Sequence, residues 1–111
     1  MTKVIIYAKE DTYDICIYGH AEKVNEGEEN LLCAAVSTLA QTLLQVIREM
    51  EEDGVLTHTE RVSDGRVRIV CSLTDAHREY VKGVLRTIET GFLLLQHGYK
   101  KNIVVVGDGN I

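Results

Sequence analysis

The chain is organised around two short stretches, Gly19-His20-Ala21 and Leu31-Leu32-Cys33-Ala34-Ala35-Val36-Ser37. The first ends an expected strand, and the second opens a long amphipathic helix. Unpaired N–H groups at a helix N-terminus favour a thiolate over a thiol, and a nearby imidazole can accept the thiol proton. Cys33 and His20 are therefore candidates for a nucleophile and its base. The alternative is that Cys33 only packs, because free cysteines are among the most buried residues.

Alternation, turn signals and apolar stripes divide the rest of the chain. Strands are expected at residues 2–8, 13–20, 55–62, 66–73 and 102–106. Helices are expected from about residue 31 to 52 and from about 76 to 97, ended by Asp53-Gly54 and Gly98. The order ββαββαβ, with mostly antiparallel neighbours, predicts an α+β fold of two layers with both helices on one sheet face. At 111 residues, we expect a single domain, residues 1–111.

The start of the first helix positions the candidate nucleophile. Asn30 is a favourable N-cap, which would put Cys33 at the third helical position. Cys33 and Ser37 are four residues apart, so they share a helix face beside the apolar stripe. We therefore expect the thiol at the margin of the core, where a substrate can reach it. Ser37 is either a substrate-binding residue or a small residue at a packing contact.

The remaining cysteines and histidines fit structural roles. Cys71 shares a strand face with Val67 and Ile69, so we expect it in the core. His58 falls in the polar alternation of a hairpin and is expected to be exposed. Three cysteines leave one unpaired in any disulfide scheme, and no CxxC or zinc-binding spacing occurs. Reduced thiols, with neither a metal nor a cofactor, fit this pattern best.

Composition excludes several classes of protein. Hydrophobic residues make up 45% of the chain, which excludes a disordered protein. No apolar run approaches the ~20 residues of a membrane helix, and the N-terminus lacks a signal pattern. We therefore expect a cytoplasmic protein with no membrane partner. The net charge of −5 disfavours a nucleic-acid partner and suits a basic protein or peptide.

Residues 21–29 concentrate negative charge between the two stretches. They hold one lysine, Lys23, and four glutamates, Glu22, Glu26, Glu28 and Glu29. The segment is either an ordinary solvated connector or a mobile flap over the site, whose charge suits a basic peptide. Gly27 can supply the backbone freedom that a moving flap needs.

The block Gly19-His20-Ala21, Gly27 and Cys33-Ala34-Ala35-Val36-Ser37 resembles the ribosomal-processing cysteine protease (Prp) family. That family shows GHA, a short loop with a glycine, and CAAVS on the first long helix. The resemblance implies a homodimeric cytoplasmic protease that removes the N-terminal extension of the twenty-seventh large-subunit ribosomal protein, cutting after a Phe. It implies Cys33 as the nucleophile and His20 as the base. Substrate-binding or orienting roles fall to Ser37, Asn30, Glu29, Gly27 and Ala34.

Two features depart from the family pattern. Asn30 stands where the family has Asp, and the loop between His20 and Cys33 is one residue longer. Asn can cap a helix but offers no negative charge to orient an imidazolium, and Glu29 takes that role if the extra residue falls after it. The departures favour a slow or divergent protease. The competing hypothesis is a non-catalytic dimeric protein that kept the fold and binds a peptide or the ribosome.

Overall fold

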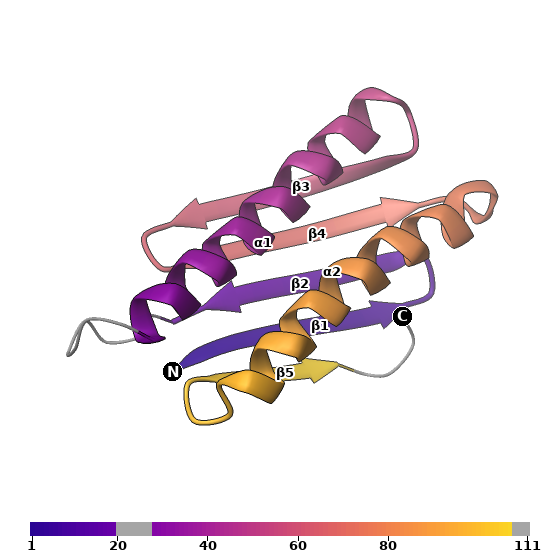
Figure 1. Cartoon of the computed structure of the whole chain (residues 1–111). Coiled ribbons are helices and arrows are strands. Elements are labelled where there is room, and N and C mark those ends of the chain that lie inside the picture. Colours follow the sequence, from indigo (N-terminus) through magenta and orange to yellow (C-terminus); the bar gives the residue numbers. More distant parts are fainter. Residues whose placement is uncertain (20–27, 108–111) are drawn as a thin grey trace.

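The computed structural model describes residues 1–19 and 28–107, with the side chains of 28–30 left out. Its elements are β1 (Thr2–Lys9), β2 (Thr12–Tyr18), α1 (Glu28–Glu52), β3 (Leu56–Ser63), β4 (Arg66–Leu73), a 3₁₀ turn (Asp75–His77), α2 (Arg78–Gly98) and β5 (Ile103–Gly107). The strands form one sheet in the order β3-β4-β2-β1-β5, in which β1 and β5 are parallel and the other neighbours antiparallel. Both helices cover one face of this sheet (Figure 1). The expected element order and two-layer α+β fold are confirmed.

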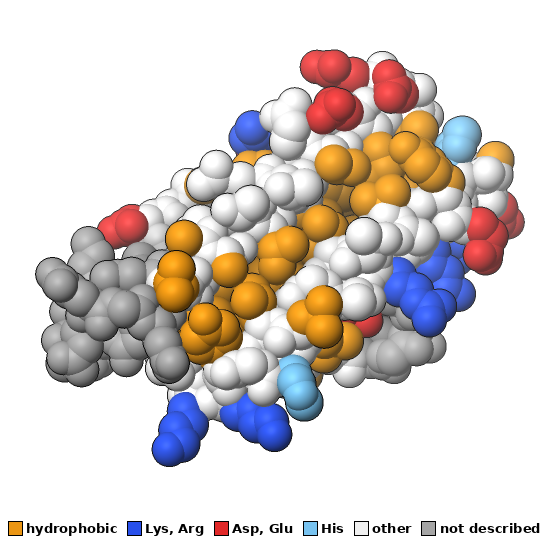
Figure 2. Space-filling view, viewed as in Figure 1, with side chains coloured by type: hydrophobic (Ala, Val, Ile, Leu, Met, Phe, Trp, Pro, Cys, Tyr) orange, Lys and Arg blue, Asp and Glu red, His pale blue; other side chains and the backbone are white. Residues whose placement is uncertain are grey.

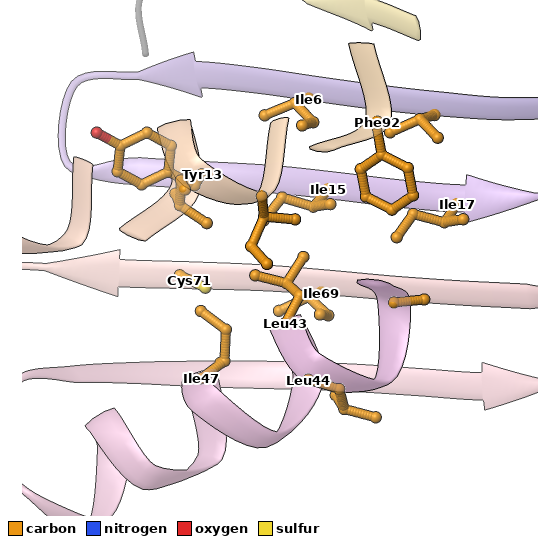
Figure 3. Packing of buried hydrophobic residues seen from close by; sticks show 14 of the residues in the cluster. Ile6, Tyr13, Ile15, Ile17, Leu43, Leu44, Ile47, Ile69, Cys71 and Phe92 are labelled. Atoms are coloured by element: carbon orange, nitrogen blue, oxygen red, sulfur yellow. The ribbon is translucent and has the colours of Figure 1, made fainter. Parts of the chain in front are cut away.

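Alternation along the strands separates a core face from an open face. In β2, Tyr13, Ile15 and Ile17 point toward the helices and are at most 4% exposed. Cys16 and Tyr18 lie on the opposite, open face, as the period of two requires. The helices fill the core from the other side with residues such as Leu43 and Ile47 of α1 and Phe92 of α2, all fully buried (Figure 3). Burying a side chain of this size contributes about 1.5–3 kcal/mol, so these stripes hold the two layers together.

The first helix begins earlier than the sequence predicts. It starts at Glu28, so Asn30 lies inside α1 and is not its N-cap, and Cys33 is the sixth helical residue instead of the third. The physical reason is the pair Glu28-Glu29, because glutamate is a good helix former and its negative charge suits the N-terminal turn. The N-cap prediction for Asn30 was wrong.

The first helix also has the length and composition of a membrane-spanning helix. Residues Leu31–Glu52 meet that simple test with a mean hydropathy of 1.5, although no such segment was expected from the sequence. Core helices of globular proteins pass the same test. In α1, Leu32, Leu43 and Ile47 are fully buried against the sheet, so core packing accounts for the apolar stripe.

Candidate functional site

Gly19 ends β2 in a conformation that only glycine accepts comfortably. Its φ is +100°, and a Cβ placed on it would lie 2.1 Å from the carbonyl oxygen of Met1. Its N–H donates to the carbonyl oxygen of Gly65 at 3.0 Å, which holds the end of β2 against the β3–β4 turn. This geometry explains the glycine of the Gly19-His20-Ala21 stretch. The next residue along the chain, His20, lies outside the described residues.

Cys33 lies at the margin of the core, as the helical spacing predicts. It is half-buried, beside the buried side chains of Leu32 and Val36, and its thiol forms no disulfide. The end of β2 and the start of α1 lie at the same end of the molecule, so the fold brings the chain leaving Gly19 toward the Cys33 end of the helix (Figure 1).

The early start of α1 changes what the helix can do for the thiol. An α-helix leaves its first four N–H groups unpaired, and Cys33 is the sixth residue of α1. The backbone N–H of Cys33 therefore belongs to the internal hydrogen-bond ladder and is not available to stabilise an oxyanion. The effect of the helix dipole on the thiolate is also reduced, because that effect falls off beyond the first turn.

Ser37 and Ala34 are exposed on α1, close to Cys33 in the helix. Ser37 lies one turn beyond Cys33 on the same helix face and is exposed, so it is not a buried residue of the core. Ala34 is exposed too, and its carbonyl oxygen accepts a hydrogen bond of 2.8 Å from the Thr38 hydroxyl. Of the other predicted site residues, Gly27 and the side chains of Glu29 and Asn30 lie outside the described part of the chain.

Contacts of α1 show which way the Cys33 side of the helix faces. Ser37 and Arg48 are eleven residues apart, close to three full turns, so Cys33, Ser37 and Arg48 share one side. Arg48 donates from Nε to Oε1 of Glu60 on β3 at 2.9 Å, so this side faces β3. α2 packs on another side, where a Cβ on Gly91 would lie 3.0 Å from the Leu39 side chain.

Strand β3, toward which this side of α1 faces, has an uncovered apolar position. Val62 of β3 points to the same sheet face as Glu60 and the core, yet it is 57% exposed. Figure 1 shows the cause, because α1 crosses the sheet obliquely and its C-terminal end lies over β3. Val67, the cross-strand neighbour of Val62, packs against the core, so this end of β3 leaves an apolar surface that α1 does not cover.

His58 corrects an expectation from the sequence. Its side chain is only 7% exposed and lies between two carboxylates, with Nδ1 3.3 Å from Glu51 and Nε2 2.8 Å from Glu60. The Arg48 guanidinium, followed by the His58 ring, lowers the pKa of Glu60 to about 2. The alternation carried the missed signal, because His58 is two residues from buried Leu56 and so faces the core side.

This His58 cluster lies apart from the candidate nucleophile. Glu51 is eighteen residues beyond Cys33 on α1, which at 1.5 Å per residue is about 27 Å along the helix axis. The cluster instead fastens the C-terminal half of α1 to the edge strand β3. It is a structural clamp and has no part in a Cys33 dyad.

The other two cysteines are separated from Cys33 by their environments. Cys71 is fully buried, and burial, followed by the charge of Glu51, raises the pKa of its thiol to about 12, which confirms the expected core role. Cys16 is half-buried on the open face of the sheet, opposite Ile5 and Arg68. Within residues 1–19 and 28–107, no three His, Cys, Asp or Glu side chains are grouped to hold a metal.

Comparisons with known proteins agree with this fold. A family model described as the cysteine protease Prp matches residues 1–104. Two crystal structures of the essential ribosomal processing protease Prp from S. aureus, one with a covalently linked product peptide and one with a substrate peptide, have TM-scores of 0.68 at 18% and 15% identity. Each alignment covers 97% of this chain and 100% of the other.

A further solved structure, SMU.848 from Streptococcus mutans, has a TM-score of 0.66 at 19% identity, over 96% of this chain and 93% of that chain. A comparison with curated proteins finds no match. At these identities the solved structures establish the fold, and the family model establishes the relationship.

Proposed function

The chain belongs to the family of the cysteine protease Prp, and from this membership we propose that it is an endopeptidase with Cys33 as nucleophile and His20 as base. The observation that carries the assignment is the position of Cys33. Its thiol lies at the core margin, on the side of α1 that carries exposed Ser37 and faces β3. Buried Cys71 has no such access, and Cys16 lies on the opposite face of the sheet.

The proposed mechanism has two stages. His20 accepts the proton of the Cys33 thiol, and the thiolate attacks the scissile carbonyl carbon. The imidazolium then returns this proton to the leaving amine as the C–N bond breaks, which leaves a thioester between Cys33 and the N-terminal product. A water molecule, deprotonated by His20, hydrolyses the thioester. Because the N–H of Cys33 lies within the helix ladder, the oxyanion requires donors other than this group.

The proposed substrate is the N-terminal extension of a ribosomal protein. Support comes from the family relationship and from the peptides bound to Prp of S. aureus. On this chain, Ser37, Ala34 and Val62 are the exposed residues that would contact an extended peptide beside Cys33. The cytoplasm, where ribosomal proteins are made, is the proposed compartment.

We also propose that the protein acts as a homodimer. The support is a group of large apolar side chains that remain exposed on the helices, namely Leu31, Leu93 and Leu94 at 63%, 42% and 69% exposure. Figure 2 shows apolar side chains gathered along the middle of the helix face. Large apolar side chains that stay exposed on one face are typical of an interaction site. Light scattering coupled to size-exclusion chromatography gives the mass, and a monomer at micromolar concentration would contradict this part of the proposal.

The cleavage test uses an N-terminally extended ribosomal protein, with products identified by mass. The parent should release the extension. Cys33→Ala should reduce cleavage at least 10³-fold and leave the fold nearly intact, because the site is at the core margin and Ala suits a helix. Cys16→Ala is the matched control and should cleave at the parent rate. If Cys33→Ala cleaves like the parent, Cys33 is not the nucleophile. If the parent binds but does not cleave, the non-catalytic peptide-binding hypothesis replaces the protease.

A further inference from the structure

The open face of the sheet gathers basic side chains that are scattered in the sequence. Arg61 of β3 is directly opposite Arg68 of β4, and Arg66 of β4 is directly opposite Tyr18 of β2. Lys3 of β1 is opposite Tyr18 on its other side. Directly opposite residues share a sheet face, so these five side chains form one surface, which we call the arginine patch. It lies on the face of the sheet away from both helices and from Cys33.

At its β3 edge the patch adjoins a cavity that wraps around this edge strand, because Arg61 and Ser63 line it from the open face while Glu60 and Val62 line it from the other face. The cavity has a volume of about 650 Å³ and is lined by Glu60, Arg61, Val62, Ser63, Arg66 and Arg68. Of the three arginines, Arg68 alone pairs with a carboxylate within the described residues, donating to Asp14 at 2.9 Å. The carboxylate of Glu60 is already bound to Arg48 and His58.

The position of Arg61 directly opposite Arg68 on the neighbouring strand lowers the stability of the fold. Like charges directly opposite one another in an antiparallel pair are destabilising. The chain has only six arginines and a net charge of −5, yet three of the six converge here. A bound anion would remove the repulsion, and arginine suits such an anion because its planar fork binds phosphate or carboxylate in a bidentate manner.

Tyr18 and Arg66 indicate which anion fits. The guanidinium carbon of Arg66 lies 5.6 Å from the centre of the Tyr18 ring, in a cation–π contact. Arginine planes and aromatic rings are the platforms on which unpaired bases stack in single-stranded RNA recognition. An acidic peptide would use the charges of the patch but not this stacking platform. A second copy of the chain would bring two arginine clusters together, which charge repulsion opposes.

We propose that the arginine patch binds single-stranded RNA, with Arg61, Arg66 and Arg68 contacting phosphates and the Tyr18–Arg66 pair stacking on a base. The overall negative charge disfavours nucleic acid over the surface as a whole, but cross-strand register concentrates the opposite sign locally. Because the patch and Cys33 lie on opposite faces of the sheet, RNA binding and proteolysis are separable, and this proposal does not depend on the proposed protease activity.

The test is fluorescence anisotropy with a labelled single-stranded RNA dodecamer of mixed sequence. The triple variant Arg61→Gln, Arg66→Gln, Arg68→Gln should bind at least tenfold more weakly than the parent. A second triple variant is the matched control, because it removes the same charge outside the patch. It carries Lys82→Gln, Arg86→Gln and Lys101→Gln and should change RNA affinity less than twofold. With three or four phosphate contacts, the parent's log–log salt slope should be about −2 to −3. Tyr18→Leu should weaken binding severalfold without changing that slope.

Several outcomes would overturn the proposal. One is that the parent does not bind the RNA at 50 mM salt. Another is that the two triple variants lose RNA affinity equally. A third is that the parent binds a poly-glutamate peptide more tightly than the RNA. Circular dichroism checks that the variants fold. If the triple variant does not fold, Arg61→Gln alone decides, because it changes one exposed residue on an edge strand and should still weaken binding about threefold. An unchanged affinity in a folded Arg61→Gln variant would contradict the proposal equally.

Discussion

Gly19 ties the candidate site to the end of the sheet. Its backbone lies against the Met1 carbonyl in a left-handed conformation, so Gly19→Ala adds both strain and a clash directly before His20. We expect a loss of about 2 kcal/mol or more in the free energy of unfolding, measured by urea denaturation, together with lower kcat/KM.

Gly83→Ala is the control for Gly19→Ala. A Cβ at Gly83 meets nothing within 4 Å on exposed α2, so this variant should gain about 0.5–1 kcal/mol from helix propensity. If Gly19→Ala were as stable as the parent, the close approach of the Gly19 backbone to the Met1 carbonyl would not require a glycine at this position.

Single residues were predictable from the sequence where local spacing decides their environment. The position of Cys33 at the core margin follows from the helical repeat, and the burial of Cys71 follows from the alternation along its strand. Both predictions are confirmed. His58 was predicted wrongly, because its polar neighbours in sequence point to the other sheet face while its own ring is covered by α1. The contact between His58 of β3 and Glu51 of α1 joins two elements, so no local sequence pattern predicts it.

At the scale of elements, the clamp between α1 and β3 predicts a pH dependence. The pKa of Glu60 is lowered to about 2 in the fold from an ordinary value of 4.5. A lowered carboxylate pKa contributes stability that is present above pH 4.5 and is lost as the pH falls toward 2. Because the pair is near the surface and screened by solvent, we expect about 1 kcal/mol.

Glu60→Gln tests the clamp by urea unfolding at several pH values. The parent should exceed the variant by about 1 kcal/mol at pH 7, and the difference should shrink between pH 4.5 and 2. Glu49→Gln, an exposed change on α1, should show no such convergence. A parent–variant difference that stays constant down to pH 2 would mean that Glu60 does not clamp the helix through its charge.

The start of α1 shows where element boundaries escape prediction. Asn30 has the chemistry of an N-cap, but the two preceding glutamates favour continuing the helix upstream, and the helix begins at Glu28. The helix itself, its stripe and its end at Glu52 were predictable, because burial of an apolar face over many turns leaves few alternatives. The boundary shift matters chemically, since it moves the N–H of Cys33 out of the unpaired first turn.

At the scale of the whole molecule, charge is distributed unevenly between segments. The acidic sequence of residues 21–29 predicts salt-sensitive recognition of a basic peptide. Raising salt from 20 to 150 mM should increase KM for the extended substrate, because exposed charges are screened over about 8 Å at the higher ionic strength. A triple variant with Glu22→Gln, Glu26→Gln and Glu28→Gln should raise KM for the same substrate at low salt. A KM independent of salt would leave this segment as a plain connector.

Sheet topology decides which whole-molecule features the sequence can reveal. The element order and the two layers follow from patterning, and they are confirmed. The arginine patch could not be seen beforehand, because Arg61, Arg66 and Arg68 meet Lys3 and Tyr18 only through the register of four strands. Likewise, the open side of α1 next to Cys33 depends on the oblique crossing of the helix, which is set by packing of the complete core.

The most direct test of the account is to trap the covalent intermediate. The parent is mixed with the extended ribosomal substrate, quenched in acid within the first turnover, digested and mapped by mass. The account predicts a thioester adduct of the N-terminal product on the peptide that contains Cys33, and none on the peptides that contain Cys16 or Cys71. Product formation with no adduct on Cys33, or with an adduct on another cysteine, would contradict the assignment of Cys33 as the nucleophile.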